Sequence, residues 1–298
     1  MKKIFYYVTM LLATTTGFSS CNDDDDDEKY AEAELIKQEE MKDLTNTYVN
    51  DVVYYTYGQL ADATESLYGK IETMKSNLSA GSLTQDQIDD VCNTFLEARA
   101  WWEKSEAWLY GPAEVHGIDP HIDTWPLSRD GLATFLKNNK NTIFASGYDI
   151  NNAIEQVSNN NNEDSWLGFH GLEFVLFRDG NPRTVSDFNG EETASEFVGS
   201  GVDGKLELDF ALAVAGDLRD HCYWLEVGWK GESAPADRIA RCQERGFTLT
   251  TQGAYTGQAL LNPGSDSPYT SWRNVLATII DSGCMNIAQV VSDQKMGQ

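Results

Sequence analysis

Residues 44–78 read LTNTYVNDVVYYTYGQLADATESLYGKIETMKSNL, and this stretch decides the fold class. Its apolar side chains recur mostly every three or four residues, the spacing that brings them onto one face of an α-helix. They are Leu44, Tyr48, Val52, Tyr55, Leu60, Leu67, Ile71, Met74 and Leu78. No proline interrupts the stretch, so the sequence predicts one long helix.

Helical signals continue towards the C-terminus. Gly81 breaks the first pattern, and Thr84 with Gln87 forms a capping box that predicts the start of a second helix. This helix is expected to end at the glycine-proline pair at 111–112. Further helical patterns begin at Ser128, near residue 166, near residue 206 and near residue 270, whereas alternating patterns are limited to short pieces such as FTLTT at 247–251. The sequence therefore predicts an all-α protein.

A turn-rich segment, RDGNPRTVSDFNGEE at 178–192, divides the helical patterns into two groups. The change in composition suggests a domain boundary near residue 200. We expect a signal peptide over 1–20 and an acidic tether with the start of the first helix over 21–40. A first helical bundle then covers 41–200, and a second covers 201–298.

The charge balance limits the partners. The chain has 22 basic and 47 acidic residues, a formal net charge of −25. A surface this negative repels the phosphates of nucleic acids, which we exclude as partners, and is compatible with cations or basic peptides.

The N-terminus predicts the location. Two lysines precede a short apolar stretch, and Ser19, Ser20 and Cys21 follow. This order resembles a bacterial lipoprotein signal, which favours acylation of Cys21 and attachment to the outer membrane over simple secretion. The acidic run at 22–28 is either a solvated tether or a signal for export to the cell surface. We therefore expect a lipoprotein of the cell envelope.

Four cysteines follow the signal, and none forms a CxxC motif. They are Cys92, Cys222, Cys242 and Cys284. In an oxidising compartment one or two disulfides can form, with Cys222 and Cys242 closing the shortest loop. Cys92 and Cys284 lie in apolar helical patterns, and the alternative for them is buried thiols.

The stretch GFHGLE at 168–173 carries the strongest chemical signal. His170 and Glu173 are three residues apart, so a helix places both on one face, where they can bind one cation or form a hydrogen-bonded pair. Gly168 and Gly171 are poor helix formers and suit a place where another backbone or a ligand comes close. The stretch lacks the HExxH and HxxEH motifs of zinc proteases.

The helix before the glycine-proline pair has a polar face of its own. Arg99, Trp102, Ser105 and Glu106 recur at helical spacing, which indicates either an internal ion pair or a site. Glu106 is a further candidate ligand, because iron, zinc and calcium ions accept carboxylate oxygens.

Polar residues also occur in the loop before Trp125. His116, His121 and Asp123 either line a cleft or are simply solvated. The sequence suggests no role for His221.

Three stretches together resemble the imelysin-like family of bacterial surface and periplasmic proteins. They are GFHGLEFVLF at 168–177, ARAWWEKSEAWLYGP with IDTWPLS between 98 and 128, and SWRNVLATIIDSGCMNIAQVVSDQKMG at 271–297. The resemblance implies two bundle-like halves with the GxHxxE motif in a cleft between them, and relatedness to a metallopeptidase and to iron-uptake components.

Position by position, the resemblance assigns His170 and Glu173 to the signature and Arg99, Ser105 and Glu106 to the upstream helix. Family members usually continue past the QKMG stretch into another helix. The resemblance therefore implies that the second bundle, and one wall of the site, are incomplete in this chain.

Two functions compete. One is capture of a metal ion or metal-bearing ligand, with His170 and Glu173 as ligands, Glu106 as a third ligand, and Arg99, Ser105 and Asp123 in support. The other is a metallopeptidase, and a structural, adhesin-like role is a third alternative. Binding is favoured because a catalytic zinc usually has three protein ligands, and only two stand at motif spacing.

Overall fold

The computed structural model describes residues 24–159 and 166–291. The expected signal peptide and the acylation site Cys21 lie outside these residues. Contacts divide the chain into two units, residues 1–42 and 43–298. No helix within the described residues is long and apolar enough to cross a membrane.

Helix α2 (Asp24–Asn46) begins inside the acidic run. From residue 30 to residue 40 every side chain is exposed except that of Lys37, which is partly buried. This stretch has few apolar residues to bury, so it is a solvated part of the helix.

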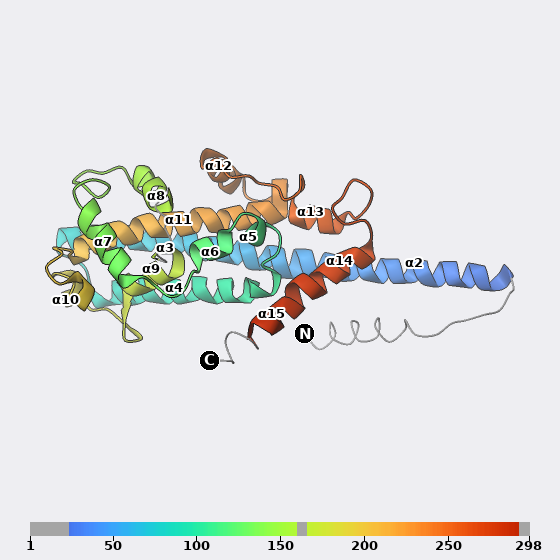
Figure 1. Ribbon diagram of the computed structural model, residues 1–298, viewed down its shortest axis with the longest axis horizontal. Helices are drawn as coiled ribbons and strands as arrows, with labels where there is room; N and C mark the ends of the chain where they lie inside the picture. The colour runs from blue at the N-terminus through green and yellow to red at the C-terminus, as the bar shows by residue number, and fades with distance from the viewer. Residues whose placement is uncertain (1–23, 160–165, 292–298) are drawn as a thin grey trace. The chain divides into compact units, whose positions relative to one another are not determined.

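The second unit has a core of long helices. Seven π-helical residues, η1 (Thr47–Val53), lead into α3 (Tyr54–Ala80), and α4 (Gln85–Ser105) follows after a short turn. Helix α11 (Gly204–Lys230) and helix α4 both pack along α3, which lies between them in the view of Figure 1. The predicted helical stretch at 44–78 is confirmed, and so is the all-α fold.

The ends of these helices follow the local signals. The Thr84 side chain accepts from the Gln87 amide, and the Gln87 side chain accepts from the Thr84 amide, which confirms the capping box. Gly81 ends α3 in the left-handed region, with φ +68°. Ser128 caps α7 (Arg129–Asn139) by accepting from the Gly131 amide, as its position predicts.

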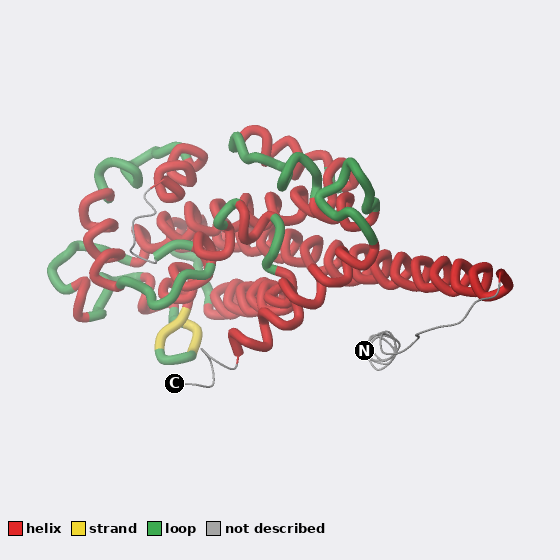
Figure 2. The backbone as a smooth tube through the Cα atoms, turned by 45° about the vertical axis from the view of Figure 1, so that its right-hand side comes forward, coloured by secondary structure: helices red, strands yellow, loops and turns green. Residues whose placement is uncertain are grey.

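Shorter elements surround this core. Between α4 and α11 lie η2 (Glu106–Trp108), α5 (Pro112–Val115), α6 (Ile118–Ile122), α7, α8 (Ile150–Asn159), α9 (Gly168–Leu176), α10 (Val185–Phe188) and η3 (Ser195–Phe197). After α11 lie η4 (Gly231–Ser233), α12 (Ala236–Glu244), α13 (Thr256–Leu261), α14 (Trp272–Thr278), η5 (Ile279–Met285) and α15 (Asn286–Val290). Within the described ranges the strands are limited to β1 (Phe177–Arg178) and β2 (Asn181–Pro182), which form one small hairpin (Figure 2).

Helix α11 begins just after the suggested boundary near residue 200, and it shares buried surface with α3, α8 and α9. The helices on both sides of the boundary thus contribute to one core. The apolar residues of α11 that are fully buried include Leu208, Phe210 and Trp229.

Five acidic residues of α11 are also buried, and each has a partner, as buried charges require. The pairs are Glu207 with Arg183, Asp209 with Lys75, Asp217 with His121 and His221, Asp220 with Arg241, and Glu226 with Arg238. Part of the large negative charge of the chain therefore lies inside the protein.

The four cysteines within the described residues are thiols. Cys92, Cys222 and Cys242 are buried and free, and Cys284 is exposed and free. Cys222 and Cys242 thus form no disulfide. Of the two cysteines in apolar helical patterns, Cys92 is a buried thiol as expected, whereas Cys284 is exposed, contrary to expectation.

Candidate functional site

The glycines of the GxHxxE motif allow the backbone of α9 to approach its neighbours closely. Gly168 has φ +58°, and a Cβ atom there would collide with the backbone carbonyl of Ile122 at the end of α6. A Cβ atom at Gly171 would collide with the carbonyl oxygen of Trp166. The expectation that another backbone comes close to the glycines is confirmed, and the contact with α6 brings Asp123 to the motif.

The His170 ring lies between two carboxylates. Its Nδ1 atom is 3.2 Å from Oε2 of Glu173, one helical turn away, and its Nε2 atom is 3.2 Å from Oδ1 of Asp123. The Trp125 ring lies against the imidazole, with the ring centres 4.9 Å apart. The Glu173 side chain is 55% exposed, whereas those of His170 and Asp123 are 15% and 11% exposed. The more protected nitrogen thus faces Asp123.

Asp123 connects the motif to α4. Its carboxylate forms an ion pair with Arg99 and accepts a hydrogen bond of 2.7 Å from Nε1 of Trp102. Burial by itself would raise the pKa of Asp123, but hydrogen bonds from its three neighbours outweigh burial and hold the pKa below the ordinary value. Asp123 is therefore a charged carboxylate at neutral pH.

A group of carboxylates meets at this point. Oxygen atoms of Glu103, Glu106 and Asp123 all lie within 4.8 Å of one another. Arg99 also contacts Glu103, with Nη2 and Oε1 2.6 Å apart. Burial opposes the charge of Arg99, yet the neighbouring carboxylates raise its pKa overall. One guanidinium thus offsets part of the repulsion among three acids.

The upstream residues divide into two roles. Arg99 and Glu106 are half-buried beside Asp123, whereas Ser105 is fully buried and donates a hydrogen bond of 2.7 Å to the backbone oxygen of Trp102. Sequence reasoning missed Glu103, although it is three residues before Glu106 and four after Arg99, both of which are helical neighbours.

The carboxylates of Glu103, Glu106 and Asp123 could together hold a cation, and His170 adds a nitrogen beside Asp123. Three carboxylates and one imidazole nitrogen, from α4, η2, the residue after α6 and α9, are the ligand types that iron, zinc and calcium accept in different proportions. The arrangement differs from the predicted pair, because Glu173 contacts the other ring nitrogen of His170.

Two hollows lie elsewhere in the second unit. One of about 700 Å³ is bordered by Lys75 on α3, and another of about 590 Å³ is bordered by Tyr110 and by parts of α13 and α14. Neither border includes His170 or Glu173. The motif is therefore characterised by its side-chain contacts and not by either of these hollows.

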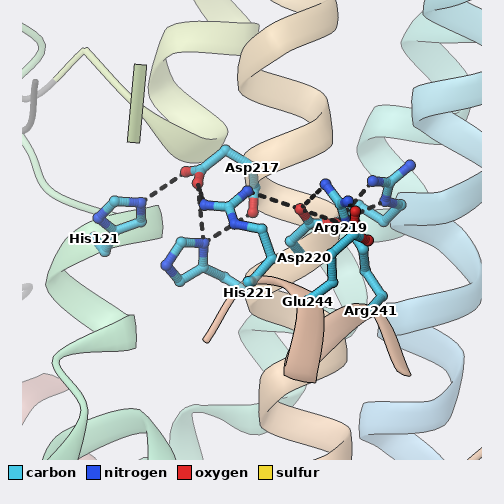
Figure 3. Close-up of polar contacts among 8 residues, drawn as sticks. His121, Asp217, Arg219, Asp220, His221, Arg241 and Glu244 are labelled. Atoms are coloured by element: carbon cyan, nitrogen blue, oxygen red, sulfur yellow. Dashed lines mark hydrogen bonds and ion pairs between the residues drawn. The ribbon is translucent and has the colours of Figure 1, made fainter. Parts of the chain in front are cut away.

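A second polar cluster, which sequence reasoning missed, joins α6 to α11 (Figure 3). The His121 Nε2 atom is 2.7 Å from Oδ2 of Asp217, and the His221 Nδ1 atom is 3.3 Å from Oδ1 of the same residue. The two imidazole rings are stacked with centres 4.0 Å apart. His121 and His221 are 100 positions apart, so no local pattern could show that they meet.

The residues of the second cluster shift one another's pKa values. Asp217 is fully buried, and burial would raise its pKa, but the two histidines lower it overall. Burial opposes protonation of His221, while Asp217 raises the pKa of His221 overall. Arg245 contacts Asp217 at 3.4 Å and Asp220 at 2.8 Å, so its stronger contact is with Asp220.

Comparisons with known proteins agree with the all-α fold. The family model described as Imelysin matches residues 53–297. Iron-regulated protein A of Synechococcus elongatus is 30% identical over 140 residues, which cover 47% of this chain and 32% of that protein. A solved structure of a protein from Parabacteroides distasonis, proposed to be an iron-regulated protein A precursor, has a TM-score of 0.58 at 20% identity. The structural similarity covers 88% of this chain and 61% of the chain in that solved structure.

The solved structure supports the fold, and the matched region spans only about a third of the length of the curated relative. The family model, in contrast, covers the long helices and both polar clusters. Because the match extends over most of the sequence, the chain belongs to the imelysin family.

Proposed function

We propose that this protein is an iron-related protein of the cell envelope that binds a metal ion beside the GxHxxE motif. One observation carries the proposal: the imidazole of His170 meets the carboxylate of Asp123, which in turn meets those of Glu103 and Glu106. Two similar proteins are named for regulation by iron, which favours iron as the ion.

In this proposal Asp123, Glu106 and Glu103 supply oxygen ligands, and His170 supplies Nε2. Glu173 contacts Nδ1 and would hold the ring in the orientation that directs Nε2 towards Asp123. Arg99 keeps two of the carboxylates in place and offsets their charge. An oxygen-rich set of this kind suits Fe(III), which prefers hard ligands.

We further propose that acylation of Cys21 attaches the protein to the outer membrane. The support is the order of residues before Cys21 and the exposed part of α2 that follows the acidic run. The alternative, a metallopeptidase, is less well supported because the group of ligands contains one imidazole and lacks the zinc-protease motifs.

The direct test measures iron bound by the purified mature protein after incubation with ferric citrate and desalting. We expect the wild type to retain iron and His170→Gln and Glu106→Gln to bind at least about 10-fold more weakly. Glu97→Gln is the matched control, because Glu97 is exposed on α4 and is not one of these ligands. Iron binding that is absent from the wild type, or equal in all four proteins, would refute the proposal.

A further inference from the structure

The cluster of His121, Asp217 and His221 has no part in the proposed function, and its geometry points to a second metal site. Each residue offers one ligand atom, and the three atoms lie within 4.8 Å of one another. We propose that these residues bind a divalent transition-metal ion such as Fe²⁺ or Zn²⁺. The proposal does not depend on a metal at the GxHxxE motif.

The donor set selects the class of ion. Two imidazoles and one carboxylate are typical ligands of divalent iron and zinc, whereas calcium and magnesium prefer oxygen ligands only. The site beside His170 has three carboxylates and one imidazole, so the two sites differ in the ions that they favour.

The surroundings hold two of the ligands in place. The His221 Nδ1 atom is 2.9 Å from the backbone oxygen of Asp217, one helical turn earlier, a contact in which it donates. Histidine ligands commonly donate one ring N–H to a carbonyl in this way, which fixes the tautomer. In this tautomer Nε2 of His221 carries the lone pair and would be the atom that binds the ion. Asp217 is fully buried, and both residues lie on the long helix α11.

The third ligand is the adjustable one. His121 lies on the five-residue helix α6 and its side chain is 12% exposed, so an ion can enter from its side. An ion bound here replaces the hydrogen bond between His121 and Asp217. The His121 ring turns from its stack on His221 to direct a lone pair at the ion.

The nearest positive group leaves room for an ion. Arg245 contacts Asp217 at 3.4 Å and Asp220 at 2.8 Å. An ion that replaces Arg245 beside Asp217 would leave the shorter contact with Asp220 intact. Arg219 and Arg241 also contact Asp220 and not Asp217. The carboxylate of Asp217 is therefore shared mainly by the two histidines.

Cobalt(II) is the probe, because its visible absorption reports nitrogen and oxygen ligands. Chelator-treated mature protein is titrated with CoCl₂ in the His170→Gln background, which weakens the other proposed site. We expect one equivalent to bind with visible bands, and His121→Gln to weaken binding at least about 10-fold. His116→Gln is the matched control, since His116 stacks on Trp224 in the same region and is not a ligand.

A second measurement avoids variants that fail to fold. Long-range ¹H–¹⁵N NMR of the His170→Gln protein during Zn²⁺ titration should shift the ring nitrogens of His121 and His221 and leave those of His116 unchanged. The proposal is overturned if Co²⁺ binding is not saturable, if His121→Gln binds as tightly as its parent, or if Zn²⁺ shifts none of the rings. Failure of ferric binding at the GxHxxE motif would leave these results unaffected.

Discussion

Gly168→Ala tests whether the close contact between α9 and α6 builds the site. Gly168 has φ +58°, a conformation that costs an alanine about 1–2 kcal/mol. The added Cβ atom would also collide with the backbone of Ile122, which cannot rotate away as a side chain can. We expect the two effects together to lower the free energy of unfolding by at least about 3 kcal/mol.

Gly81→Ala separates the two effects. Gly81 has φ +68° at the end of α3, and a Cβ atom there meets nothing within 4 Å. The control should therefore lose only the conformational part, about 1–2 kcal/mol. Urea unfolding followed by circular dichroism measures both losses. If Gly168→Ala lowers the free energy of unfolding no more than Gly81→Ala does, α9 does not approach α6 as closely as the structure shows. The conclusion that this contact brings Asp123 to the motif would then be wrong.

Three further predictions concern single residues. Asp123→Asn should lower the free energy of unfolding by about 2–4 kcal/mol at pH 7, because Arg99 loses its ion pair with the largely buried carboxylate of Asp123. The pKa of Asp123 in the folded state lies below its ordinary value, so its ionised carboxylate stabilises the fold above that ordinary value, and this stabilisation is lost as the pH falls through the folded-state pKa. When the pH is lowered below 4, the free energy of unfolding measured with urea should therefore fall less in the variant than in the wild type. Thr84→Ala should cost about 1 kcal/mol in the same assay by removing the cap of α4. Cys284 should be the fast-reacting thiol among the four described cysteines in Ellman's assay, and Cys284→Ser should abolish that phase, since the other three are buried and burial raises the pKa of Cys92 to about 12.

Local patterns predicted the features that depend on neighbours in the chain. Helical periodicity gave α3, the capping box gave the start of α4, and the three-residue spacing gave the contact between His170 and Glu173. Each of these depends on residues less than about two helical turns apart, and the physics of one helix is sufficient to predict them.

Contacts between residues far apart in the sequence could not be predicted from local patterns. Asp123 follows a five-residue helix with no strong pattern, so the sequence could not show that it joins His170 to α4. The buried acids of α11 were equally hidden, because their partners lie on other elements. An acidic residue on a helix normally indicates a solvated face, and tertiary pairing overrides that expectation here.

Helix α6 explains how the two proposed metal sites can lie near each other and still be separable. His121 and Asp123 are two residues apart, and such neighbours do not face the same way. His121 meets Asp217 on α11, whereas Asp123 meets His170 on α9. A variant of one proposed ligand should therefore weaken metal binding at one of the two proposed sites only. Gly168→Ala displaces the backbone between the two residues and should weaken both, a result that assigns α6 the role of common support.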